Sequence, residues 1–118
     1  MEFALIMPIL VMLVLGIIEL AMAFNNQQGL HAAAREGARA AAVPTATQAD
    51  IEAVVNSALV GVPVESTPTI AVTPNVTTPC GAADAVVVEV SSESVVSIPF
   101  WANQTYTLTG RGEFRCES

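Results

Sequence analysis

The feature that most constrains this chain is its first 42 residues, an uninterrupted stretch that changes character halfway along. Residues 3 to 24 (FALIMPILVMLVLGIIELAMAF) are almost all apolar, and the next 18 (NNQQGLHAAAREGARAAA) are polar and rich in Ala. About 20 apolar residues span a bilayer core, and Ala, Arg, Glu and Gln are strong helix formers. Without a turn signal before Pro44, we expect one helix of about 40 residues, about 60 Å long. Such a helix is about twice as long as a plain membrane anchor needs to be.

The rest of the chain is one small acidic domain. We place the helix in residues 1–43 and a head in residues 44–118, which is near the lower limit for a self-sufficient core. The chain carries a formal charge of −7, and the head alone carries −6, with eight acidic residues against two Arg. Because an acidic head without Lys repels phosphate groups, we expect no binding of nucleic acid.

The sequence of the head predicts a short helix followed by strands. After Pro44, Thr45 and Gln48 fit a capping box, an apolar face recurs at helical spacing, and Gly61 and Pro63 end the helix. The apolar face consists of Ile51, Val54, Val55, Ala58 and Leu59. Strands are expected at residues 69–73, at residues 85–90 extending toward Ile98, and at residues 104–116. The fold class is therefore α+β, with an antiparallel sheet of about three strands.

The last strand predicts a sheet face with unusually little bulk. Alternation places Tyr106, Leu108, Phe114 and Cys116 on one face, together with Gly110 and Gly112. The two glycines leave room for a close neighbour, for which the short helix and a disulfide are the candidates. Cys80 and Cys116 predict one disulfide that closes a loop of about 36 residues and contributes roughly 3–4 kcal/mol. Two free thiols are the alternative.

Catalytic chemistry has little support in the sequence. The one histidine, His31, lies on the long helix without a nucleophile or a carboxylate in a triad pattern, so we expect a helix-surface residue without a role. No Gly-rich phosphate loop occurs, and two cysteines without clustered histidines do not make a zinc site. We expect a protein that is not an enzyme and that holds no metal and no cofactor, with the acidic residues forming a solvated face.

The polar half of the long helix carries a stripe of small residues, formed by Gly29, Ala33, Gly37 and Ala41. Such a stripe lets another helix approach to backbone contact, and glycine lowers helix stability and so needs a reason. We therefore expect the stripe to pack against neighbouring copies, so that Gly37→Leu would block assembly and leave the head folded. The alternative is that Ala only stabilises a long helix.

Three residues interrupt the apolar half. Glu19 costs about 2.5–3.5 kcal/mol on insertion scales unless it is paired or neutral. Pairing between subunits, for example with Asn25, Asn26 or Gln27 of a neighbour, stands beside snorkelling and protonation as its explanation. Pro8 removes a backbone hydrogen bond and Gly16 adds a second weak point. Either a simple kink or local melting that lets packed helices fit would follow.

Two further features concern processing. Asn75 and Asn103 each begin an N-x-Thr sequon in a predicted loop and are possible glycosylation sites. Met1 and Glu2 supply no basic flank, and the apolar run is too long for the core of a cleaved secretory signal. We therefore expect the run to be retained, with any basic leader upstream of this chain.

The opening EFALIMPILVMLVLGIIELAMAF and the block AAREGARAAA resemble the TadE-like proteins of bacterial tight-adherence (Tad, type IVc) pilus systems. The likeness covers Glu2 to Ala42, and in the head only residues 112–115 are similar. It implies a prepilin peptidase that removes a leader and an inner-membrane machine that adds subunits to a filament. It also implies that Glu2 neutralises a neighbour's N-terminal amine. In most family members several residues precede that carboxylate, so either the mature chain does not start at Met1 or the registration differs.

The resemblance and the residues together predict a structural subunit of an extracellular Tad pilus. We expect insertion in the bacterial cytoplasmic membrane, followed by assembly into a helical homopolymer through the N-terminal helix. Two alternatives stay open. One is a minor pseudopilin that acts as a membrane-bound assembly adaptor, and the other is a pilus-associated adhesin whose loops around Trp101 make the contact.

Overall fold

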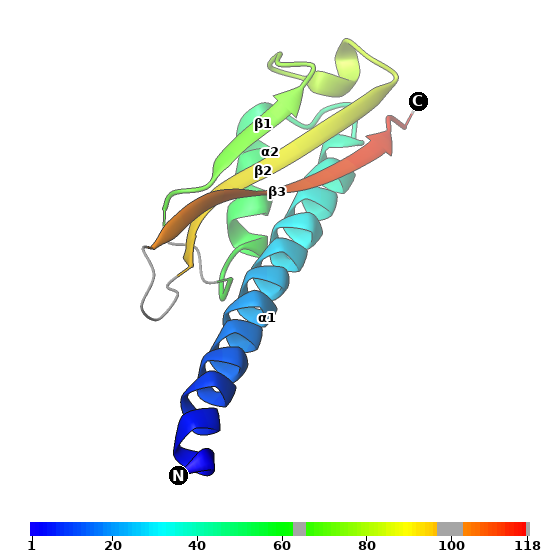
Figure 1. Ribbon diagram of the computed structural model, residues 1–118. Coiled ribbons are helices and arrows are strands. Elements are labelled where there is room, and N and C mark those ends of the chain that lie inside the picture. The colour runs from blue at the N-terminus through cyan, green and yellow to red at the C-terminus, as the bar shows by residue number, and fades with distance from the viewer. Residues whose placement is uncertain (63–65, 97–102, 118) are drawn as a thin grey trace.

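The computed structural model describes residues 1–62, 66–96 and 103–117, and it shows one long helix with a small head at its C-terminal half (Figure 1). The fold is α+β, as predicted. The molecule measures 71 × 20 × 20 Å. In chain order the elements are helix α1 (Glu2–Ala41), helix α2 (Gln48–Ala58), strand β1 (Thr69–Thr73), a 3-10 turn (Pro79–Gly81), strand β2 (Ala85–Val96) and strand β3 (Gln104–Arg115). Pro63, Ile98 and Trp101 lie outside the described residues.

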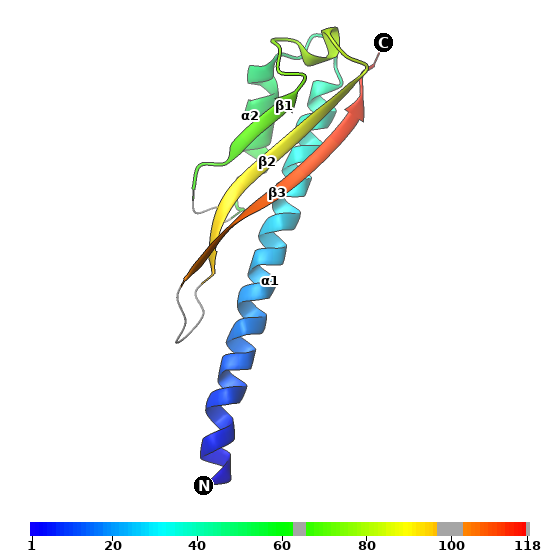
Figure 2. The same ribbon diagram turned by 45° about the horizontal axis from the view of Figure 1, so that its top comes forward.

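The sheet is antiparallel, with the order β1-β2-β3. Its register pairs Val88 with Gly112 and Val90 with Gly110, so bulky residues of β2 stand beside glycines of β3. Both helices cover the same face of the sheet, and the other face is open to solvent (Figures 1 and 2). Thr107, Thr109 and Arg111 point to the open face and are exposed, as the alternation predicted.

The core lies between the sheet, α2 and only the C-terminal half of α1. Its buried residues are Leu30, Ala33, Ala34, Ala38, Ala41, Ile51, Val55, Leu59, Val72, Val86, Val88 and Val90. Valine dominates the sheet side because β-branched residues suit a pleated surface, and alanine dominates the α1 side because small side chains let the helix approach the sheet. The long helix is therefore part of the head over its second half and stands free over its first.

The start of α2 corrects one prediction. Its capping box consists of Thr47 and Asp50, whereas Thr45 lies in the turn after α1 and Gln48 is the first helical residue. The Thr47 hydroxyl accepts from the backbone N–H of Asp50 (3.3 Å), and the Asp50 carboxylate accepts from the backbone N–H of Thr47 (3.0 Å). A carboxylate is the stronger acceptor for this bond, and it also suits the positive end of the helix dipole.

The neighbour of Gly110 and Gly112 is also not the one expected. Both glycines lie against the backbone of α1, Gly110 beside Leu30 and His31 and Gly112 beside Ala34 and Arg35. A side chain at either position would collide with main-chain atoms of the helix, so glycine sets the distance between helix and sheet. Phe114, predicted on the same inward face, is 43% exposed at the edge of the sheet, whereas its partner Val86 in the central strand β2 is fully buried.

Candidate functional site

The N-terminal half of α1 is the most unusual surface of the molecule. Every residue from Met1 to Ile18 is exposed, and nearly all are large and apolar. Among the described residues, α1 is the one helix long and apolar enough to cross a membrane. A soluble monomer does not leave so much apolar surface in water, so this half of the helix needs a lipid or protein environment.

The predicted interruptions lie within this free half. Glu2 is in the first turn and exposed. Pro8 is inside the helix, and residues 2–41 remain one helix across it. At Gly16 an added Cβ atom would meet nothing within 4 Å. The helix surface at this position therefore has no side chain and is not covered by another part of the chain. The structure therefore leaves all three positions free for contacts outside the chain.

Glu19 lies in a groove where the free half of α1 meets the head. The groove has a volume of about 620 Å³ and is lined by residues of α1, β2 and β3. Figure 2 shows that the ends of β2 and β3 next to the residues drawn in grey stand away from α1. Its lining is Met12, Gly16, Glu19, Leu20, Ala23, Phe24 and Gln27 from α1, and Val96, Gln104, Tyr106 and Leu108 from the strands. The walls are mostly apolar. Glu19 is half-buried and has no hydrogen-bond or ion-pair partner among the described residues.

The strand side of this groove was missed by sequence reasoning. Alternation placed Tyr106 and Leu108 on the inward face, but it gave no indication of which segment they would face. They face residues 12–27 of α1, which precede the point at Leu30 and His31 where Gly110 brings β3 into backbone contact with the helix. The divergence of strand and helix away from that contact opens the groove.

The stripe of small residues is covered by the chain's own head. Ala33, Gly37 and Ala41 are buried, and Gly29 is half-buried beside Val62. A Cβ atom at Gly37 would collide with Val55, so Gly37→Leu would enter the head core rather than leave the head folded. The expected approach of another helix to this stripe therefore gives way to packing within the chain, because one face cannot hold both neighbours.

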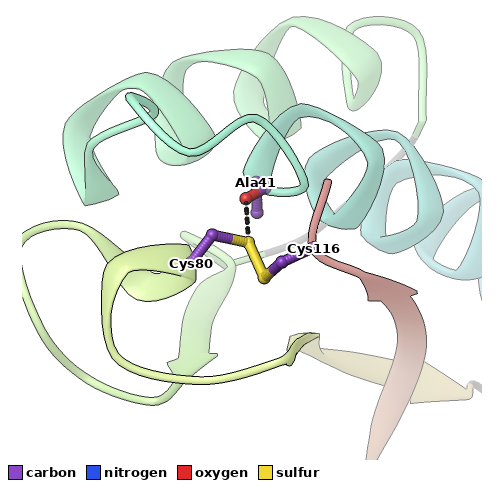
Figure 3. Close-up of a disulfide and its surroundings, with 3 residues drawn as sticks. All are labelled: Ala41, Cys80 and Cys116. Carbon is purple, nitrogen blue, oxygen red and sulfur yellow. Dashed lines mark hydrogen bonds between the residues drawn. A yellow bond between two sulfur atoms is a disulfide. The ribbon is translucent and has the colours of Figure 1, made fainter. Parts of the chain in front are cut away.

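The disulfide lies at the other end of the head, against the end of α1. Cys80 and Cys116 are joined, with Cα atoms 5.5 Å apart (Figure 3). The Sγ of Cys80 lies 2.9 Å from the carbonyl oxygen of Ala41. Because a disulfide sulfur has no proton to donate, this is a close sulfur–oxygen contact. The backbone N–H of Glu117 donates to the carbonyl of Ala42 (3.0 Å), so the chain end also satisfies the end of α1.

His31 has a structural partner that the sequence did not indicate. Its Nδ1 accepts a hydrogen bond from the backbone N–H of Arg111 (3.2 Å). The two residues are 80 positions apart in the chain, so no local pattern could have joined them. The expectation of a surface histidine without a role is wrong in this respect, because His31 links α1 to β3.

The remaining predicted positions lie on the surface of the head. Asn75 and Asn103 are both exposed, and their glycosylation stays a prediction. Within the described residues, no three His, Cys, Asp or Glu side chains gather in a way that could hold a metal ion. Arg111 and Glu113 form an exposed ion pair at 3.5 Å, a kind of contact that contributes little to stability.

A comparison with protein families gives one match. The family model described as TadE-like protein matches residues 1–39, about one third of the chain. This match confirms the resemblance over the N-terminal helix. Comparisons with curated proteins and with solved structures gave no match.

Proposed function

We propose that this protein, with its TadE-like N-terminal helix, is a structural subunit of an extracellular Tad pilus and polymerises through that helix. One observation carries the proposal: the apolar half of α1 is fully exposed from Met1 to Ile18, while the other half is built into the head. The same surface can serve twice. It first holds the chain in the cytoplasmic membrane, and it then packs against other copies when the helix leaves the lipid.

The charge distribution supports this order of events. The head carries −6 and suits an outer, solvated surface, whereas carboxylates on the apolar half need partners once that half is enclosed in protein. Glu2, exposed in the first turn of α1, is proposed to pair with the N-terminal amine of a neighbour. Prepilin peptidase and the inner-membrane assembly machine are the partners that the TadE-like match suggests.

The test is the substitution Glu2→Ala in the full chain. It should stop filament formation and leave membrane insertion unchanged, because insertion depends on the apolar run and not on one carboxylate. Glu89→Ala is the matched control, since Glu89 is an exposed carboxylate of β2 on the head and not on α1. Fractionation of membranes measures insertion, and the yield of surface filaments measures assembly.

The opposite result favours an alternative. If Glu2→Ala gives filaments at the parental yield, the carboxylate has no part in assembly, and a membrane-anchored adhesin becomes the better proposal. An assembly adaptor would be indicated if the parental chain stayed in the membrane fraction while filaments of another protein depended on it.

A further inference from the structure

The groove at Glu19 combines apolar walls with one unpaired carboxylate. Glu19 of α1 is half-buried, and it lines the groove together with the strand residues Gln104, Tyr106 and Leu108. Within the described part of the chain no cation lies in the groove lining. A carboxylate in such surroundings is costly unless an opposite charge or hydrogen-bond donors reach it. The groove therefore selects an occupant that is mostly apolar or small and carries one cation.

The back of α1 has the complementary character. Arg35 and Arg39 are exposed, and neither has a carboxylate partner among the described residues. At about 100° per residue, both lie nearly opposite Glu19 around the helix, facing away from the groove and the head. Exposed Ala32 lies beside them, so this back surface is narrow enough to enter a groove.

Of the two cations, Arg35 is the better match. Arg39 lies in the last turn of α1, where a cation already compensates the negative end of the helix dipole. Arg35 lies one turn earlier and has no such role. Its long side chain can also lay its methylene groups along apolar walls while the guanidinium reaches a carboxylate.

We propose that the groove of one copy holds the back of α1 from a second copy, with Arg35 of the second copy paired to Glu19 of the first. This inference rests on the proposed function and names the contact that builds the polymer. Helices inserted in one membrane in the same orientation are parallel. Glu19 and Arg35 are 16 residues apart, so the second copy is displaced by about 24 Å along the helix axis.

The geometry of this contact explains how copies can be added repeatedly without forming a closed ring. Each copy has one groove and one back surface, and the two surfaces are different, so the interface is heterologous and repeats from copy to copy. An axial displacement at every step gives an open helical array and not a ring. Glu19 then restricts the register to two neighbouring positions, because a shift of one helical turn, about 5.4 Å, exchanges Arg35 for Arg39. The dipole role of Arg39 favours the position with Arg35.

A photocross-link tests the contact in cells that assemble filaments, because copies inserted in one membrane lie at the same depth and reach a displacement of about 24 Å only when one of them leaves the lipid. Tyr106, on the strand wall of the groove, is replaced by the photoreactive residue p-benzoylphenylalanine in the full chain, which is expressed in these cells and illuminated. Thr107, exposed on the opposite face of β3, is the matched control. We expect the probe at position 106, and not the probe at 107, to link to residues 28–39 of a second copy. Links only to other proteins, or only to the head of a second copy, would overturn the proposal.

A charge exchange provides the second readout. Glu19→Arg and Arg35→Glu should each reduce the position-106 cross-link at least tenfold, and the double variant should restore at least half of it. Arg115→Glu makes the same charge change on the exposed head surface and should leave the link unchanged. A double variant no better than the two single variants contradicts the ion pair. The cross-link and the filament composition are separate measurements. If the position-106 cross-link is strong but sheared filaments do not contain this chain, the groove contact stands and only the role as a structural subunit is contradicted.

Discussion

Gly112 of β3 lies directly on the backbone of Ala34 in α1: a Cβ atom added to Gly112 would stand 2.5 Å from the Ala34 carbonyl oxygen and 2.7 Å from the Arg35 Cα atom. These are main-chain atoms of a long helix, so they cannot move aside as a flexible side chain could. The contact fixes how closely the sheet approaches α1, and it determines where the groove below it opens.

Gly112→Ala should therefore lower the stability of the head by about 1–3 kcal/mol, the usual cost of overpacking. Thermal unfolding of the full chain in detergent micelles measures the loss. Gly16→Ala is the matched control, because the added methyl group meets nothing within 4 Å and Ala favours the helix. An unchanged unfolding temperature for Gly112→Ala would show that helix and sheet are not held in this contact.

Gly37→Leu should unfold the head rather than only block assembly. The new side chain would enter the space of Val55, with Ile51 and Val88 close behind it, and a core at native packing density does not accept that volume. Unfolding monitored by near-UV circular dichroism checks this outcome, and the variant should show no cooperative transition. A folded head that fails to assemble would restore the stripe as a contact between copies.

Removal of the disulfide should destabilise the head by roughly 3–4 kcal/mol, because a bond across 36 residues restricts the unfolded chain. Comparison of Cys80→Ser with the parental chain by chemical denaturation gives the value. Non-reduced mass spectrometry should show no alkylatable thiol in the parental protein, and two such thiols would show that the bond is absent.

Asp50 gives the head a dependence on acid pH. Its pKa lies below the ordinary value of 3.8 because the Thr47 hydroxyl, and next the Thr47 backbone N–H, donate to the charged carboxylate. A lowered pKa in the folded state means that the stabilisation is complete above the pKa of the unfolded chain. It is lost as the pH falls through the folded value. Unfolding temperatures of Asp50→Asn and of the parental chain should therefore converge below pH 3.8, and a constant difference would contradict the assignment.

The sequence predicted the elements of this fold more reliably than their partners. The apolar run joined to an Ala-rich segment predicted α1, and alternation predicted β1, β2 and β3, because these patterns depend on local periodicity alone. Spacing also showed that Gly29, Ala33, Gly37 and Ala41 share a face, but it could not show that the face is covered by the chain's own head.

Only the α1 wall of the groove at Glu19 could be predicted from the sequence, because local patterns do not show which distant segments come together. Glu19 stood out as a charge in an apolar run, whereas the opposite wall comes from Tyr106 and Leu108, more than 80 positions further along. The hydrogen bond between His31 and Arg111 has the same origin. Contacts between distant segments depend on how closely helix and sheet approach, and the glycines that control the approach indicate room without indicating the neighbour.

The most direct test of the central claim is the composition of purified surface filaments. Filaments are sheared from cells that express the full chain, purified by sedimentation, and analysed by quantitative mass spectrometry against an internal standard of this protein. A structural subunit that polymerises through α1 should be the main protein component of the filament. Filaments in which this chain is absent, or present only in trace amounts beside another main protein, would contradict the claim.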